Sequence, residues 1–192
     1  MSHAFGSHHL RRLFLVLVFS CLASIGIATG SVLTSGSNNQ IRFAAMQMDV
    51  KVDGEFRNFT ADIAFDPARP ESGQANLDID LASVSTGSAE ADTVLKGRDF
   101  FDAAHFPRAS FLSTRIIVDG QGHYQAIGRF TLKGHSADLT VPFTARPGPD
   151  GLLLEGSMPI SRLAYKVGEG EWSDTGTLAD QVQIRFKLHL PR

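Results

Sequence analysis

Apolar and polar side chains alternate with a period of two along most of the chain after residue 41. Successive side chains of a β-strand point to opposite faces, so this alternation predicts strands with one buried face. In 182–190, for example, Val, Ile, Phe and Leu alternate with Gln, Arg, Lys and His. The same pattern predicts further strands at 46–52, 59–65, 77–81, 124–132, 139–143 and 154–160.

Turn-forming residues separate these segments. The Asp-Gly pairs at 53–54 and 119–120 are strong hairpin-turn signals, because Gly accepts positive φ and Asp tolerates it. Gly134 and the Pro- and Gly-containing segments 67–73 and 147–151 mark the other breaks. The chain is therefore expected to reverse direction at short intervals.

This arrangement predicts an all-β domain, either an antiparallel sandwich or a closed, extended barrel of about eight strands. One short connecting helix is expected within 88–104. Small residues on the inward stripes (Ala61, Ala126, Gly128 and Gly156) favour an internal cavity, because they leave volume. They equally suit the taper or bulges of a filled core, so the pattern alone leaves both alternatives open.

The N-terminal segment has the features of an export signal. Two arginines at 11–12 precede an apolar run over 13–27, and small residues follow at 28–30. We expect a signal peptide at 1–30, a flexible Ser/Gly/Asn-rich linker at 31–40 and one domain at 41–192. The expected location is therefore outside the cytoplasm.

Two alternatives to cleavage stay open. The segment 13–33 is about as long as the roughly 20 residues that span a bilayer, so it could be an uncleaved anchor, although Ser, Thr and Gly dilute its second half. Lipidation of Cys21, the single cysteine, is less well supported, because Phe19 is bulky and the residues after Cys21 stay apolar.

The residues give little support to catalysis, metal binding or nucleic-acid binding. A net charge of -2 argues against a nucleic-acid partner, since phosphate binding needs surplus Lys and Arg. No HExxH, GxSxG or phosphate-binding loop is present. We therefore predict no catalytic residues, no metal site and no required cofactor. The histidines after residue 41 are not at metal-ligand spacing: His105, His123, His135 and His189.

A series of short motifs occurs in one order along the chain. They lie at 54–59 (GEFRNF), 64–67 (AFDP), 77–87 (ending SVSTG), 100–102 (FFD), 106–107, 111–114, 124–134 and 168–172 (GEGEW). In this order they resemble the YceI family over about 135 residues.

The resemblance implies a lipocalin-like barrel, exported to the periplasm, whose apolar tunnel holds a polyisoprenoid such as a quinone tail. It thus favours the cavity over the filled core. Family members often carry a histidine in the segment matching 91–95, but this chain has Val94 there, so a head-group role for that histidine is not available. The residues expected to line the tunnel are Met46, Met48, Ile63, Phe65, Leu77, Ile79, Phe111, Tyr124, Ala126, Phe130, Val141, Phe143, Met158, Trp172, Ile184 and Phe186.

The leading hypothesis is a carrier of a polyisoprenoid or other long apolar lipid, working near a membrane. A packed structural or stress-response module without ligand is the alternative, and an enzyme acting on a hydrophobic substrate is the third. Oligomeric state stays open, with a homodimer as one option. Trp172 either plugs one end of the barrel, which its large apolar area favours, or forms a lid over the mouth. Phe100, Phe101 and Phe106 are expected to pin the helix to the barrel.

The export hypothesis predicts where the mature chain begins. N-terminal sequencing of the periplasmic protein should start near Ser31, because the small residues 28–30 suit signal peptidase. An intact Met1 in a membrane fraction would instead support the anchor.

Overall fold

A computed structural model describes residues 30–36 and 38–191. The predicted signal peptide lies outside these residues, except for Gly30. The described chain is dominated by eleven strands that form one antiparallel sheet. The strands are β1 (Ser31–Thr34), β2 (Gln40–Gln47), β3 (Val50–Phe56), β4 (Phe59–Ala64), β5 (Gln74–Asp80), β6 (Val84–Ser85), β7 (Arg108–Val118), β8 (His123–Leu132), β9 (His135–Gly148), β10 (Gly151–Ser161) and β11 (Gln181–Pro191).

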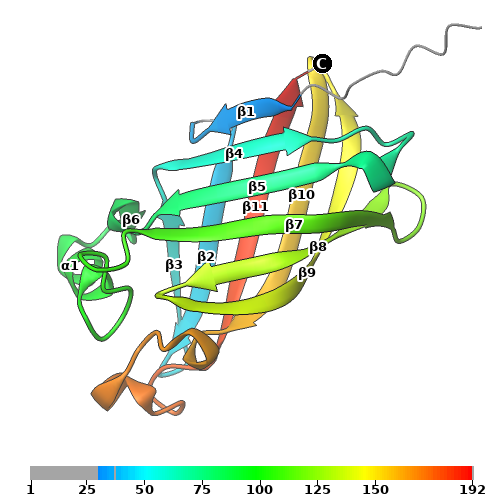
Figure 1. The fold of residues 1–192 in the computed structure, drawn as a ribbon. Coiled ribbons are helices and arrows are strands. Elements are labelled where there is room, and N and C mark those ends of the chain that lie inside the picture. Colours follow the sequence, from blue (N-terminus) through cyan, green and yellow to red (C-terminus); the bar gives the residue numbers. More distant parts are fainter. Residues whose placement is uncertain (1–29, 37, 192) are drawn as a thin grey trace, which may run out of the picture.

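The sheet curls on itself in the order β1-β4-β5-β7-β8-β9-β10-β11-β2-β3-β6. In Figure 1, β4, β5 and β7 cross in front of β2, β11 and β10 at a steep angle, so the two halves enclose an interior. The all-β, lipocalin-like barrel is thus confirmed, although with more than the eight strands predicted. Three strands were not revealed by the alternation: the short edge strands β1 and β6, and the long strand β7.

The central strands follow the predicted alternation closely. Along β8, Tyr124, Ala126 and Gly128 are buried while the residues between them are partly exposed. A bulge at 113–115 shifts the register between β7 and β8, and such bulges bend a strand. The shift explains why Phe111 and Ile116, which differ in parity, are both buried.

The turn predicted at 53–54 is wrong, because Asp53 and Gly54 lie inside β3. The chain reverses instead at Met48 and Asp49, which both have left-handed backbones (φ 46° and 61°). The predicted strand 46–52 is therefore divided between two strands. Gly54 serves packing rather than turning: a Cβ there would lie 2.2 Å from the Phe43 ring, so only glycine allows this ring to cross β3.

The linker predicted at 31–40 is also wrong for its first residues. Ser31–Thr34 form β1, which pairs antiparallel with β4. The reason is the burial of Leu33, which lies opposite Ala61 in the register and is only 5% exposed. Burying an apolar side chain offsets the entropy lost when a short Ser-rich segment is ordered.

The helix forms within the predicted range but is shorter. α1 spans Ala89–Lys96; the Ser88 side chain accepts a hydrogen bond from the Ala91 N–H, and Gly97 ends the helix. Short 3-10 turns occur at η1 (Pro70–Ser72), η2 (Leu81–Ser83), η3 (Leu163–Tyr165) and η4 (Gly170–Ser173). Within the described ranges, no helix has the length and apolar character needed to cross a membrane.

The packing of β1 yields a stability test. Leu33→Ala should lower the free energy of unfolding by about 2–3 kcal/mol, because it removes a buried side chain and leaves a cavity. Val32→Ala is the matched control: this neighbour is 70% exposed, and its loss should change stability by less than about 0.5 kcal/mol. Urea unfolding followed by circular dichroism measures both. Equal effects would contradict a structural role for β1.

Candidate functional site

The interior of the curled sheet contains a cavity of about 540 Å³, within the usual range of ligand pockets. Its wall is made almost entirely of aliphatic and aromatic side chains from both halves of the sheet and from α1. The cavity volume decides between a filled core and an internal cavity, the two alternatives that the alternating pattern left open, in favour of the cavity. The inward side chains form a wall around a space and do not fill it.

Most of the residues predicted to line a tunnel lie on this wall. Ala126 of β8 lies between Ile116 and Val141 in the sheet register, and all three line the cavity. Their contact with a ligand stays a prediction. The predicted residues on the wall are Ile63, Phe65, Leu77, Ile79, Phe111, Ala126, Phe130, Val141, Phe143, Met158, Trp172, Ile184 and Phe186.

Met46 and Met48 were wrongly assigned to the wall. Met46 is 40% exposed and Met48 is 65% exposed at the turn between β2 and β3. A shift of one residue moves a whole stripe to the opposite face of a sheet. The inward stripe of β2 has the other parity: Ile41, Phe43, Ala45 and Gln47 line the cavity.

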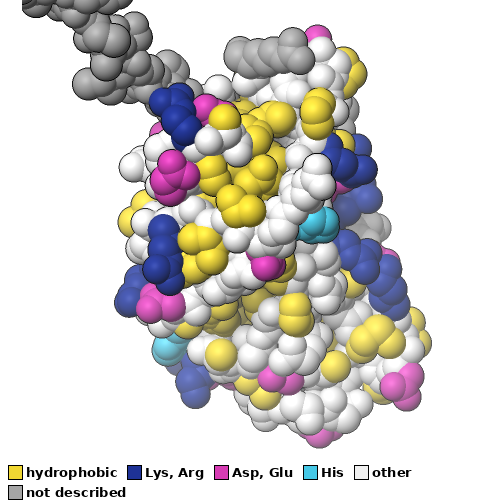
Figure 2. All heavy atoms as spheres, turned by 90° about the vertical axis from the view of Figure 1, so that its right-hand side faces the viewer, with side chains coloured by type: hydrophobic (Ala, Val, Ile, Leu, Met, Phe, Trp, Pro, Cys, Tyr) yellow, Lys and Arg dark blue, Asp and Glu magenta, His cyan; other side chains and the backbone are white. Residues whose placement is uncertain are grey.

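Tyr124 is buried but does not line the cavity. Its ring stacks on Phe143 (centroids 5.4 Å apart) and meets the edge of Phe65 (5.0 Å). Phe65 and Phe143 do reach the wall, so Tyr124 supports them from behind. This aromatic cluster lies where β4 ends, away from α1 (Figure 1). The molecular surface at that end shows hydrophobic side chains between Lys and Arg side chains (Figure 2).

The small inward residues act in two different ways. Ala61 and Ala126 line the cavity and leave it volume, as the sequence predicts. Gly156 does not, because a Cβ there would lie 2.3 Å from the Phe186 ring, which already covers it. At Gly128 the β7 backbone leaves no room either, since a Cβ would lie 2.3 Å from the Leu112 carbonyl oxygen. These glycines allow close packing and do not create space.

A chain of aromatic rings extends along the end of the cavity near α1. Phe43 packs on Phe56 (5.6 Å between centroids), Phe56 on Phe101 (5.8 Å), and Phe100 on Trp172 (5.4 Å). All five residues reach the wall.

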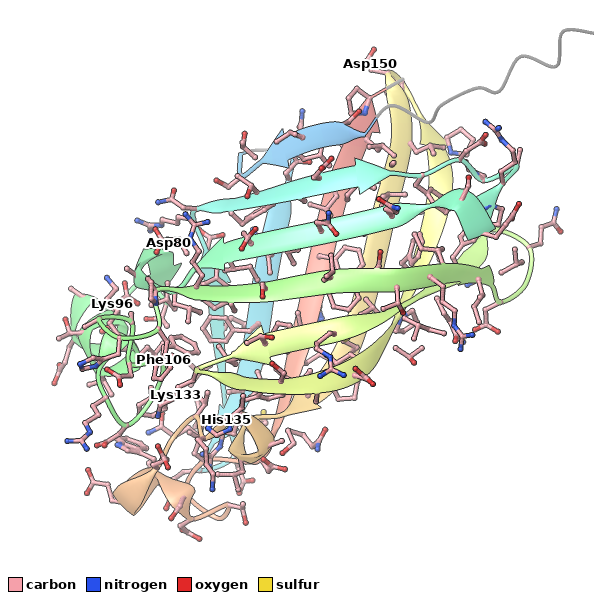
Figure 3. The ribbon with its side chains drawn as sticks, in the orientation of Figure 1. Asp80, Lys96, Phe106, Lys133, His135 and Asp150 are labelled. Carbon is pink, nitrogen blue, oxygen red and sulfur yellow. The ribbon has the colours of Figure 1, made fainter. Side chains whose placement is uncertain are left out.

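Phe100 and Phe101 therefore do more than fasten α1, although they were expected only to pin it. Phe106, by contrast, stays at the surface, where its ring lies against Gly134. Figure 3 shows Phe106, Lys133 and His135 at the same end of the barrel as Lys96 of α1, with Asp150 at the opposite extremity. The Phe-Phe pair at 100–101 is a sequence signal that could have predicted this part of the wall, because two adjacent phenylalanines outside a strand are costly to leave in water.

Among the residues that the structure describes, Arg162 is the one Lys or Arg on the cavity wall, and no sequence pattern indicated it. It is 3% exposed, and its guanidinium donates hydrogen bonds only to main-chain carbonyls. Burial lowers the pKa of Arg162, and nearby Asp180 partly offsets this. The acceptors are the carbonyl oxygens of Ala179 (3.1 Å), Val167 (2.9 Å), Gly168 (2.9 Å), Trp172 (2.7 Å) and Leu178 (2.6 Å).

These bonds use all five N–H groups of the guanidinium. Arg162 thereby holds the segment 163–180, and with it Trp172, over the end of the cavity. The buried Lys133 ammonium adds a second fastening, donating to the Lys166 carbonyl (2.7 Å) and the Glu169 carboxylate (2.9 Å). This ammonium holds the pKa of the Glu169 carboxyl below its ordinary value.

Titratable groups do not converge in the described part of the chain as catalysis or metal binding would require. No group of three His, Cys, Asp or Glu is placed to hold a metal ion among residues 30–36 and 38–191. His105 pairs only with Asp102 (2.8 Å), three residues before it and at the surface. The described residues of the cavity wall are mainly aliphatic and aromatic.

Comparison with known proteins identifies the family. A family model described as a YceI-like domain matches residues 32–190. The chain belongs to the YceI family. This confirms the resemblance that the ordered motifs indicated.

Solved structures share the fold. BcnA of Burkholderia cenocepacia is 38% identical with a TM-score of 0.76, over 78% of this chain and 94% of that one. The Campylobacter jejuni YceI protein is 26% identical with a TM-score of 0.67, over 73% and 85%. A polyisoprenoid binding domain from Saccharophagus degradans, 15% identical with a TM-score of 0.64, covers 82% and 96% and shows likeness of fold alone.

Curated relatives are similar in sequence. A UPF0312 protein of Shewanella oneidensis is 29% identical over 135 residues, which are 68% of this chain and 71% of the relative. A UPF0312 protein of Yersinia pestis is 38% identical over 88 residues, and the match spans 45% of that relative's length.

The Arg162 network predicts that lysine cannot replace arginine in this YceI-family protein. A lysine has three donors, so Arg162→Lys leaves at least two buried carbonyls without a partner, each costing about 1–3 kcal/mol. We expect the free energy of unfolding in urea to fall by about 3 kcal/mol or more. Arg129→Lys is the control, because Arg129 forms an exposed pair with Asp138 and should tolerate the change within about 0.5 kcal/mol. A similarly small loss for Arg162→Lys would show that the network is not needed.

Proposed function

We propose that this protein binds a long apolar lipid of the polyisoprenoid class in the cavity and carries it outside the cytoplasm, without catalysis. The observation on which this rests is the 540 Å³ apolar space enclosed by the curled sheet. The Saccharophagus degradans neighbour, described as a polyisoprenoid binding domain, supports the ligand class. The apolar segment at 13–27, preceded by basic residues, supports export.

The shape and chemistry of the wall suit a prenyl chain. Aliphatic walls and tilted rings offer dispersion contacts along an elongated path and require few hydrogen bonds. At about 25 cal/mol per Å² of apolar area, burying several isoprene units contributes more than about 10 kcal/mol before the costs of binding. Affinity should therefore rise with chain length until the cavity is full.

A substitution inside the cavity tests the proposal. Ala126→Trp adds an indole to the wall between Ile116 and Val141, where the ligand would lie. We expect the purified variant to retain much less isoprenoid lipid than wild type, with the melting temperature of lipid-free protein nearly unchanged. Organic extraction followed by mass spectrometry quantifies the lipid.

Ala44→Trp is the matched control. Ala44 lies on β2 with the parity opposite to Phe43 and Ala45, so its new indole points away from the cavity. It should retain lipid like wild type. If the interior were a packed core, Ala126→Trp would instead destabilise the lipid-free protein by about 1–3 kcal/mol. That result, together with no lipid in any extract, would favour the packed structural module.

A further inference from the structure

The cavity wall carries polar groups at one end, beside α1. Apart from its apolar residues, the wall includes Thr86, Ser88, Glu90 and Arg162, and Gln47, which pairs with Leu178. Asn76 also lines the cavity, but near the start of β5, at the far end from α1. Asn76 belongs to the outer parity of β5, opposite Leu112, which is 57% exposed. Thr86, Ser88 and Glu90 are every second residue from the end of β6 into the first turn of α1, and Glu90 is exposed to solvent as well. A residue that both lines a cavity and meets solvent marks an opening.

The positive charge of the wall is not available to a ligand. Every N–H of the Arg162 guanidinium is bonded to a main-chain carbonyl. Turning it toward a ligand would leave buried carbonyls without donors, at about 1–3 kcal/mol each. Among the residues described, no other Lys or Arg lines the cavity.

The negative charge at the opening, that of Glu90, is available to a ligand. The Thr86 hydroxyl donates to Asp92 (2.8 Å), and the Ser88 hydroxyl oxygen caps α1. Within the described chain, by contrast, the Glu90 carboxylate has no hydrogen-bond or ion-pair partner of its own.

The basic residues nearby act on a different carboxylate, that of Asp92. The pKa of Asp92 is lowered first by hydrogen bonds from Thr86, and further by Lys96 and Arg57. Neither Lys96 nor Arg57 reaches the cavity wall. The free polar group at the opening is therefore the Glu90 carboxylate.

We infer that the opening selects an uncharged, hydroxyl-bearing head group, and that Glu90 is the residue that excludes a phosphate. A hydroxyl can donate to the Glu90 carboxylate, whereas a phosphate brings about −1.5 to −2 charges against it with no free cation to compensate. The ligand class is then an isoprenoid alcohol and not an isoprenoid phosphate. This inference rests on the proposed binding of an isoprenoid chain in the same cavity.

Two ligands with one hydrocarbon chain test the inference. Geranylgeraniol and geranylgeranyl monophosphate differ only in the head group. Their binding to lipid-stripped protein can be followed through the fluorescence of Trp172, the single tryptophan, which lines the cavity. Wild type should bind the alcohol at least about fivefold more tightly than the phosphate, and added salt should narrow the difference because it screens charge at an exposed site.

Variants of Glu90 show whether the preference comes from the Glu90 charge or from the two ligands themselves. Glu90→Gln keeps the shape of the side chain and should reduce the preference for the alcohol, while Glu90→Lys should abolish or reverse it. Glu71→Lys makes the same charge change in η1, outside the cavity, and should leave the preference as in wild type. Melting curves verify that each variant is folded, and Glu90→Gln decides the matter if the lysine disrupts α1.

The outcomes distinguish the two proposals. Equal affinities for both ligands, or a preference that Glu90→Lys and Glu90→Gln leave unchanged, would overturn the role of Glu90 while lipid binding stands. Failure of wild type to bind either ligand would overturn the proposed function itself.

Discussion

One face of a single curled sheet has to act both as hydrophobic core and as cavity wall. In an ordinary sandwich, two sheet layers pack about 10 Å apart, and their inward side chains interdigitate and leave no space. Here the sheet turns through enough strands that its inner face surrounds a volume larger than its side chains occupy. Rings are laid flat against the wall where glycine allows it, as Phe186 is against Gly156 and Phe43 against Gly54. Backbone close packing at the wall thus coexists with free volume at the centre.

The apolar interior depends on a polar structure at its end. The segment 163–180 has little regular secondary structure, and its carbonyls would be costly to bury without partners. Arg162 satisfies five of them from one side chain, and Lys133 satisfies another from the turn between β8 and β9. A buried cation of this kind is expensive to desolvate, and it is retained here because its hydrogen bonds are complete. Because the guanidinium of Arg162 is fully hydrogen-bonded, its charge is not available to a ligand, and the cavity keeps an apolar character.

The sequence predicts the strands where one parity is apolar and the other polar. In β8 and β11 this contrast is strong, and the wall residues Ala126, Phe130, Ile184 and Phe186 follow from it. In 41–48 both parities carry Ala, Met or larger apolar residues, so the register is not determined locally. The Asp53-Gly54 pair has the composition of a turn, but it lies in a strand, where Gly54 makes room for the Phe43 ring. The role of Arg162 could not be predicted at all, because its acceptors are brought together only by the fold.

An empty interior of this size is a cost that the chain has to offset. In engineered cores each Å³ of cavity costs about 24 cal/mol, so 540 Å³ corresponds to a cost on the order of 10 kcal/mol, comparable to the whole stability of a domain. When a wall folds around its own cavity, no side chain has been removed, so part of this cost is avoided. The wall atoms still lack packing contacts on the side that faces the cavity. A ligand that supplies these contacts binds the folded state and not the unfolded chain, and it therefore stabilises the fold in proportion to its affinity. In such a protein, stability and lipid binding are linked through the same wall, so lipid content and melting temperature should be measured on the same sample.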